Sequence, residues 1–106
     1  MWQVLETLRN REALSDVDIE LARFLAEQDA EAGWPVVLGA CLASRAPQQG
    51  DTCVDLVAQA GRPVMEDEEP VAVAPSLDAW REALTASPVV GDPGDFRPLI
   101  LEDDRL

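Results

Sequence analysis

Apolar side chains recur at helical spacing along several stretches of the chain, and this pattern predicts a mainly helical fold. The opening segment "WQVLETLR" predicts a short helix over about residues 2–9. The segment "SDVDIELARFLAEQDAEAG" predicts a longer helix, with Ser15 as N-cap and Asp16 and Asp18 in the first turn, where the helix dipole favours negative charge. Gly33 is expected to end this second helix.

A third helix is predicted for "WPVVLGACLASRA", because Pro35 suits a first helical position and no charged side chain occurs from residue 36 to 43. A helix that is apolar all round is buried on several sides, so this segment is expected to be the central helix. Gly39 should let a neighbouring element pack closely. A further helix is predicted for "PSLDAWREALTASP", capped by Ser76 and ended by Pro88.

The apolar positions of these helices predict a single core. On the second helix, the inner face is expected to follow Val17, Leu21, Phe24, Leu25 and Gln28, since these positions recur at helical spacing, and Ile19, Ala22 and Ala26 are expected to widen it. The predicted core contains Leu21, Phe24, Leu25, Val37, Leu38, Cys41, Leu42, Leu56, Trp80 and Leu84.

The remaining segments are shorter and less regular. "TCVDLV" is either a short extended piece or the start of a helical turn that Gly61 ends. The consecutive acids Glu66–Glu69 indicate a solvated loop. Near the end, "PLIL" predicts a strand and "EDD" the tip of a hairpin. The fold is therefore expected to be mainly α, a small bundle of four to five short helices with a minor β-hairpin element at the C-terminus, in a single domain over residues 1–106.

The predicted C-terminal strand has a consequence for association. Arg105 and Leu106 would begin the returning strand of the hairpin, where the sequence ends, so we expect a fragment of a longer protein with an unpaired strand edge. This edge is a possible interface with a partner or a second copy, and it would present Leu99, Ile100, Leu101 and Leu106. A crystal dimer through residues 98–106 is a corresponding expectation.

Composition excludes several kinds of chemistry. The 106 residues include 21 acids and 8 basic residues, all arginines, for a net charge of −13, and there is no lysine or histidine. A phosphate-binding P-loop requires its lysine, and the Ser-His-Asp and Cys-His mechanisms require a histidine base. We therefore expect this chain to be non-catalytic, with no cofactor and no metal.

The charge also limits the partners. Nucleic acid binding relies on cations that neutralise phosphates, so direct contact with nucleic acid is not expected of this acidic chain. No stretch reaches membrane-spanning length and no signal peptide is recognisable, which favours a cytoplasmic protein with reduced thiols.

Some residues still suggest sharper alternatives. One hypothesis is that the loop "ASRAPQQGDTC" gathers Arg45, Gln48, Gln49 and Cys53 around a ligand. The other, which we favour, is that it connects two buried segments. Asp55 lies in an apolar run, where it would either act as a catalytic acid or, as we expect, cap the next turn or point to solvent. A metal site in the run Glu66–Glu69 is disfavoured, because adjacent carboxylates diverge.

The order of these segments resembles a known family. Ser44-Arg45-Ala46, then Gly50, then Thr52–Leu56, then the tryptophan helix with Ser87–Gly91 and the terminal "PLILEDDRL" are similar to the N-terminal region of RecD. RecD is the alpha subunit of exodeoxyribonuclease V, the RecBCD helicase–nuclease. The resemblance covers about residues 17–106, and it lies in the order and spacing of the segments more than in any one of them.

The resemblance implies a role without catalysis in this segment. The whole subunit would be an ATP-dependent 5′→3′ DNA helicase in double-strand break repair and recombination, with ATP and Mg²⁺ bound in motor domains that are absent here. This segment would contact the RecC-type gamma subunit. The alternatives are a free-standing acidic protein that mimics DNA or inhibits a basic partner, and a small metal-dependent enzyme that uses carboxylates.

Overall fold

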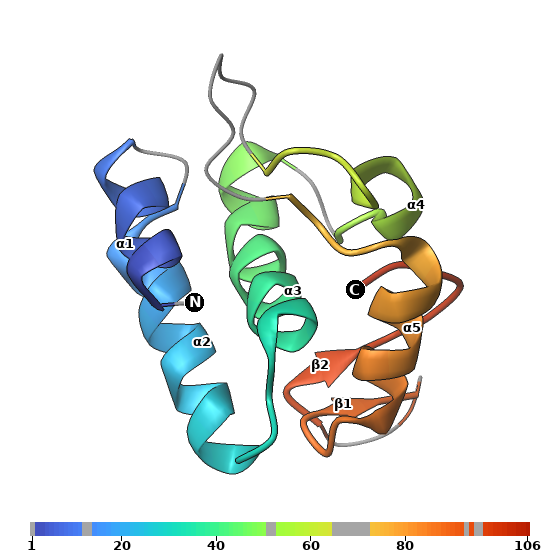
Figure 1. The fold of residues 1–106 in the computed structure, drawn as a ribbon. Coiled ribbons are helices and arrows are strands. Elements are labelled where there is room, and N and C mark those ends of the chain that lie inside the picture. The colour runs from blue at the N-terminus through green and yellow to red at the C-terminus, as the bar shows by residue number, and fades with distance from the viewer. Residues whose placement is uncertain (1, 12–13, 51–52, 65–72, 93, 95–96) are drawn as a thin grey trace.

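The computed structural model describes residues 2–11, 14–50, 53–64, 73–92, 94 and 97–106. Within these residues the fold is mainly helical, as predicted, with a small sheet near the C-terminus (Figure 1). The elements in chain order are α1 (Trp2–Asn10), α2 (Asp16–Gln28), α3 (Trp34–Arg45), the 3₁₀ turn η1 (Ala46–Gln49), α4 (Leu56–Gln59), α5 (Leu77–Ala86), β1 (Val90–Gly91) and β2 (Leu99–Ile100).

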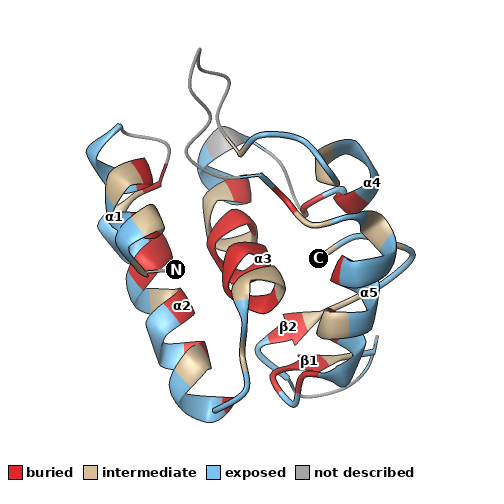
Figure 2. Ribbon diagram, in the orientation of Figure 1, coloured by how far each residue is buried: buried red, intermediate tan, exposed pale blue. Residues whose placement is uncertain are grey.

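Helix α3 is the centre of the molecule. It packs against α2 on one side and against α5 on the other, and the two C-terminal strands lie beside α5 (Figure 1). Every residue from Val36 to Leu42 is buried, which Figure 2 shows as a nearly continuous red helix. Burial on several sides therefore explains why this part of α3 contains no charged residue.

The core agrees with most of the predicted positions. The buried members are Leu25, Val37, Leu38, Cys41, Leu42, Leu56, Trp80 and Leu84. Leu21 is only partly buried. Phe24 is 55% exposed and Val17 67% exposed, so the predicted inner face of α2 is wrong at these positions. The buried residues of α2 are Leu25 from that face, Ile19 and Ala22, which were expected to widen it, and Asp18, which was not expected to be buried.

The orientation of α2 is connected to its first turn. Ser15 is the N-cap, as predicted, and its hydroxyl accepts a hydrogen bond from the Asp18 backbone N–H. The Asp18 carboxylate in turn accepts from the Ser15 N–H at 3.0 Å, which completes a capping box. Since Asp18 is fully buried, this reciprocal cap lies on the inner side of the helix.

The end of α2 differs from the prediction. The helix ends at Gln28 with Asp29 as C-cap, and Gly33 is the N-cap of α3. The Asp29 carboxylate accepts a hydrogen bond from the Glu31 N–H at 3.1 Å and from the Ser87 hydroxyl at 2.7 Å. The buried pair of Asp29 and Ser87 thus joins the end of α2 to the end of α5.

Gly39 has the role expected from the sequence. A Cβ at this position would lie 2.9 Å from Leu106 Cδ2, 3.4 Å from Leu84 Cδ2 and 3.5 Å from Trp80 Nε1. The indole of Trp80 is fully buried and donates to the Pro35 carbonyl at 2.9 Å. The absence of a side chain at residue 39 therefore lets α5 and the last residue approach α3 closely.

The C-terminal sheet differs in detail from the expected hairpin. Strands β1 and β2 pair in parallel, with Val90 opposite Leu99 and Gly91 opposite Ile100. Strand β1 lies in the segment "VVGDPGD", whose glycines and proline are residues typical of turns. The hairpin is limited to the turn that follows β2, where Glu102 and Arg105 form an antiparallel bridge.

The segments on both sides of the acidic run lie next to each other. Pro63 and Val73 form an antiparallel bridge, and the Ala74 N–H donates to the Arg62 carbonyl at 2.8 Å. The run Glu66–Glu69 itself, with the expectation of a solvated loop, lies outside the described residues. Among the helices of the described ranges, none combines the length and apolar character needed to cross a bilayer.

Candidate functional site

A tight turn after β2 shapes the C-terminal edge of the molecule. Asp103 and Asp104 both have positive φ, at 49° and 64°. The Glu102 N–H donates to the Arg105 carbonyl at 3.0 Å, and the Arg105 N–H donates to the Glu102 carbonyl at 2.9 Å. Two successive left-handed residues define the turn type that suits β-hairpins, and aspartate tolerates this conformation better than most residues.

The turn brings the last residues against the segment that precedes α4. The Leu56 N–H donates to the Asp104 carbonyl at 2.9 Å, and the Leu106 N–H donates to the Val54 carbonyl at 3.0 Å. Asp55 and Arg105 form an antiparallel bridge between these bonds. "Cys-Val-Asp-Leu" and "Asp-Asp-Arg-Leu", which are far apart in the sequence, are thus neighbours in space.

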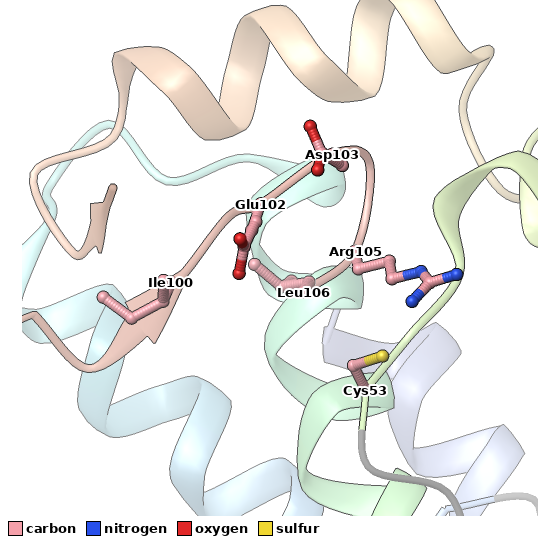
Figure 3. A pocket seen from close by; sticks show the side chains of 6 residues that line it. All are labelled: Cys53, Ile100, Glu102, Asp103, Arg105 and Leu106. Carbon is pink, nitrogen blue, oxygen red and sulfur yellow. The ribbon is translucent and has the colours of Figure 1, made fainter. Parts of the chain in front are cut away.

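A surface hollow of about 590 Å³ lies beside this pairing. Its lining residues come from the last strand, the turn and the start of the α4 segment, and Figure 3 shows them: Cys53, Ile100, Glu102, Asp103, Arg105 and Leu106. The lining combines apolar side chains with both signs of charge and one thiol. Such a surface is suited to contact with another polypeptide, with apolar contacts at its centre and charged contacts at its rim.

The turn is held to α5 by an ion pair. Two of the guanidinium nitrogens of Arg81, Nε and Nη2, donate hydrogen bonds to the two carboxylate oxygens of Asp104. This bidentate hydrogen bonding lowers the pKa of Asp104 below its ordinary value and raises the pKa of Arg81. The charges of Asp104 and Arg81 are therefore used to fix the turn against the helix.

The residues predicted for the edge interface occupy different environments. The side chain of Leu99 is buried in the core, in a strand that pairs with β1. Ile100, Leu101 and Leu106 are partly exposed, and Ile100 and Leu106 line the hollow. Association through this edge stays a prediction for these three residues.

The loop after α3 connects elements instead of gathering all of its polar side chains. The Gln48 amide donates to the buried Asp18 carboxylate at 3.4 Å, so it points towards the first turn of α2. Arg45 and Cys53 line a smaller cavity of about 170 Å³, with Asp55 and Gln59 beside them. The side chain of Gln49 lies outside the described part of the chain.

The remaining candidates have structural roles. Asp55 is the N-cap of α4 and accepts from the backbone N–H groups of Val57 and Ala58 at 3.1 and 3.3 Å, so the predicted cap is confirmed. Cys41 and Cys53 are not joined in a disulfide. Burial and the nearby Asp18 raise the pKa of the Cys41 thiol to about 12, and this thiol donates to the Asp18 carbonyl at 3.7 Å.

Each tryptophan packs within the fold. Trp80 is buried, Trp34 donates to the Val73 carbonyl at 3.1 Å, and Trp2 has the Arg23 guanidinium 5.3 Å from its ring centroid. Across the described ranges, no group of three or more histidine, cysteine, aspartate or glutamate side chains is arranged to hold a metal ion.

Sequence reasoning missed the two buried acids, Asp18 and Asp29. For Asp18, the spacing Ser15-x-x-Asp18 is a capping-box signal that would have placed its carboxylate at the helix start. For Asp29, the sequence contains no comparable signal, because its partner Ser87 is distant along the chain.

The chain is therefore a small, acidic, mainly helical domain whose buried polar side chains are bonded within its own fold. Residues 10–106 match the family described as RecBCD enzyme subunit RecD, N-terminal domain, and the chain belongs to this family. It is also 39% identical, over 86 residues, to a protein of Mycolicibacterium smegmatis named RecBCD enzyme subunit RecD. The match covers 81% of this chain and 15% of the relative, so the chain corresponds to a small part of the relative's length.

The structure gives the family-like segments a common location. The Ser-Arg-Ala step closes α3, and η1 leads from it towards the Cys-Val-Asp-Leu segment. That segment pairs with the final Asp-Arg-Leu. The hollow of Figure 3 is thus formed where two of these segments meet.

Proposed function

We propose that this chain is the non-catalytic, subunit-docking N-terminal domain of a RecD-type alpha subunit in an exodeoxyribonuclease V assembly. The observation that carries the proposal is the family match over residues 10–106. In the proposed assembly, the complete subunit is an ATP-dependent 5′→3′ DNA helicase in double-strand break repair and recombination, located in the cytoplasm. ATP and Mg²⁺ bind in its motor domains, outside this chain.

Hydrogen bonding of several carboxylates within the fold supports the non-catalytic part of this proposal. Asp18, Asp29 and Asp55 cap helix ends, and Asp104 is paired with Arg81. Catalysis needs acids and bases that are free to exchange protons with a substrate. These carboxylates are already bonded to the protein itself.

The partner in this proposal is the RecC-type gamma subunit. The experiment is co-expression of the 106-residue chain, affinity-tagged, with that subunit, followed by co-purification in moderate salt. We expect the two to co-purify, and the purified chain alone to hydrolyse no ATP and cleave no DNA. Either activity in the isolated chain would overturn the non-catalytic role, and failure to co-purify would overturn the docking role.

A second function rests on the net charge of −13, which suits a free-standing acidic module that occupies the DNA-binding surface of a basic protein. Competition with duplex DNA distinguishes this second function from the first. Such a module binds a basic DNA-binding protein tightly and is displaced by duplex DNA. Capture of the gamma subunit, undisturbed by added DNA, favours the RecD-type docking domain instead.

A further inference from the structure

Helix α2 carries large apolar side chains on its outer surface. Val17 is 67% exposed and Phe24 is 55% exposed, and both belong to the small group of large hydrophobic residues exposed in the described chain. Leu21 lies between them and is half-buried. At spacings of four and three residues, these side chains form one line along the helix, about 10 Å long at 1.5 Å rise per residue. We call Val17, Leu21 and Phe24 the α2 stripe.

Val17 and Phe24 lie outside the core of the fold, whereas Leu21 is half-buried and packs against that core. The core side of α2 is already made by Ile19, Ala22 and Leu25, with the buried capping residue Asp18. A single exposed apolar residue is ordinary on a protein surface, whereas a line of them at helical spacing is typical of a helix that binds in an apolar groove.

The charged residues beside the α2 stripe indicate which kind of charge its partner should carry. Asp16, Glu20 and Glu27 are all exposed on the helical surface next to Val17 and Phe24. Asp16 is paired with Arg9 of α1 at 3.1 Å. Arg23, which precedes Phe24, is also exposed, and its guanidinium lies over the ring of Trp2 in α1. Carboxylates therefore outnumber this one arginine beside the stripe, on a chain with a net charge of −13. A second copy of the chain would bring like charges together, which disfavours self-association through this face.

We infer that the α2 stripe is the face by which this domain docks onto its partner subunit, and that the partner offers an apolar groove rimmed by arginine or lysine. This inference rests on the proposed function. Helix α3 separates α2 from α5 and the C-terminal strands (Figure 1), so docking through α2 leaves the hollow of Figure 3 uncovered. The two surfaces are able to bind different segments at once.

The test is the affinity of the gamma subunit for variants of the 106-residue chain, measured by biolayer interferometry. The double variant Val17→Ser/Phe24→Ser should bind at least about tenfold more weakly, because a few anchor side chains, aromatic ones such as Phe24 above all, carry most of the binding energy of an interface. Val57→Ser is the matched control, since Val57 is 58% exposed on α4, and it should bind like the wild type. Circular dichroism and thermal unfolding establish that each variant is folded.

The charge component is tested separately. Glu20→Gln/Glu27→Gln should slow association and reduce the dependence of the affinity on salt, whereas Glu31→Gln/Glu82→Gln should leave both unchanged. Equal weakening by the two pairs would overturn the assignment of the acidic border to the interface.

The remaining outcomes separate the inference from the function on which it rests. If the gamma subunit binds the wild type and Val17→Ser/Phe24→Ser equally well, the α2 stripe is not the docking face, although the docking function stands. If the gamma subunit binds neither the wild type nor the double variant, both the proposed function and the inference are overturned. If sedimentation shows a wild-type dimer that this double variant abolishes, the occupant of the stripe is a second copy and the inference is overturned.

Discussion

Buried polar residues in this domain complete hydrogen bonding that the helix ends leave open. Asp18 accepts from the first turn of α2, and Asp29 accepts beyond its last turn. Each carboxylate also accepts a hydrogen bond from a side chain of a distant segment. Gln48 donates to Asp18, and Ser87 donates to Asp29. These acids therefore connect elements at the same time as they cap a helix, which accounts for their burial in a chain whose other acids are mostly on the surface.

The Asp29–Ser87 contact predicts a specific loss of stability. Ser87→Ala removes the hydroxyl that donates to the buried carboxylate of Asp29. We expect the free energy of unfolding in urea to fall by about 1–3 kcal/mol, the usual consequence of leaving a buried acceptor without its donor. Thr85→Ala, at an exposed position of α5, is the control and should change it little. Equal stabilities of the two variants would contradict the role of Ser87.

The Arg81–Asp104 pair predicts a pH dependence. The pKa of Asp104 is lowered from its ordinary 3.8 by hydrogen bonding to Arg81. A carboxyl group whose pKa is lower in the folded than in the unfolded state stabilises the fold at pH values above its unfolded pKa. This contribution is lost as the pH falls through its folded pKa. Arg81→Gln should therefore be less stable than the wild type near neutral pH, and the difference should shrink below pH 3.8.

Nuclear magnetic resonance titration of the Asp104 carboxyl group checks the cause directly. In the wild type its midpoint should lie below 3.8, and in Arg81→Gln it should move upward. Arg62→Gln removes a different exposed arginine and should leave the midpoint in place. An unchanged midpoint in Arg81→Gln would contradict the assigned cause.

The two cysteines predict a difference in reactivity. The pKa of Cys41 is raised to about 12 by burial, so its thiol stays protonated and shielded at pH 8, whereas Cys53 is partly exposed. A thiol-specific disulfide reagent should titrate one thiol in the folded chain and both in guanidinium. Folded Cys53→Ser should give almost no reaction, and rapid reaction of this variant would show that Cys41 is accessible.

At the scale of elements, α3 depends on the absence of a side chain at Gly39. Gly39→Val places a branched side chain against Trp80 and Leu84, so the free energy of unfolding should fall by about 1–3 kcal/mol, as for other overpacked cores. Gly39→Ala should cost less, because Leu106 can turn aside at the chain end and alanine favours the helix. Thermal and urea unfolding of both variants measure the difference, and a Gly39→Val variant as stable as the wild type would contradict close packing here.

The sequence pattern predicts where the helices lie better than it predicts which side of a helix faces the core. The caps Ser15 and Ser76 and the buried α3 follow from local chemistry and were predicted. The face of α2 was not, because Val17 and Phe24 fit helical periodicity as well as the true core residues do. Only the packing of α2 against α3 decides between the two faces.

The same limit applies to the candidate site. The hollow depends on the pairing of residues 54–56 with 104–106, and no local pattern in either segment specifies such a distant partner. The parallel pairing of β1 with β2 is also non-local, and each strand has only two residues. The predicted turn after β2, by contrast, follows from the conformational tolerance of two adjacent aspartates.

At the scale of the whole molecule, the central helix divides the surface into two parts. The acidic α2 side carries exposed apolar residues, and the opposite side carries the hollow formed by the C-terminal turn. The chain belongs to the RecD N-terminal family, and the α2 side is the face that we propose for docking onto the partner subunit. Its carboxylates, in this account, serve the fold and the recognition of a basic partner.

The most direct test of this account is the mass of the complex formed when the 106-residue chain is mixed with the RecC-type gamma subunit. Size-exclusion chromatography with light scattering provides that mass. The account predicts one chain bound to one gamma subunit, with no requirement for ATP or DNA. Separate elution of the two proteins, each at its own mass, would contradict the docking function.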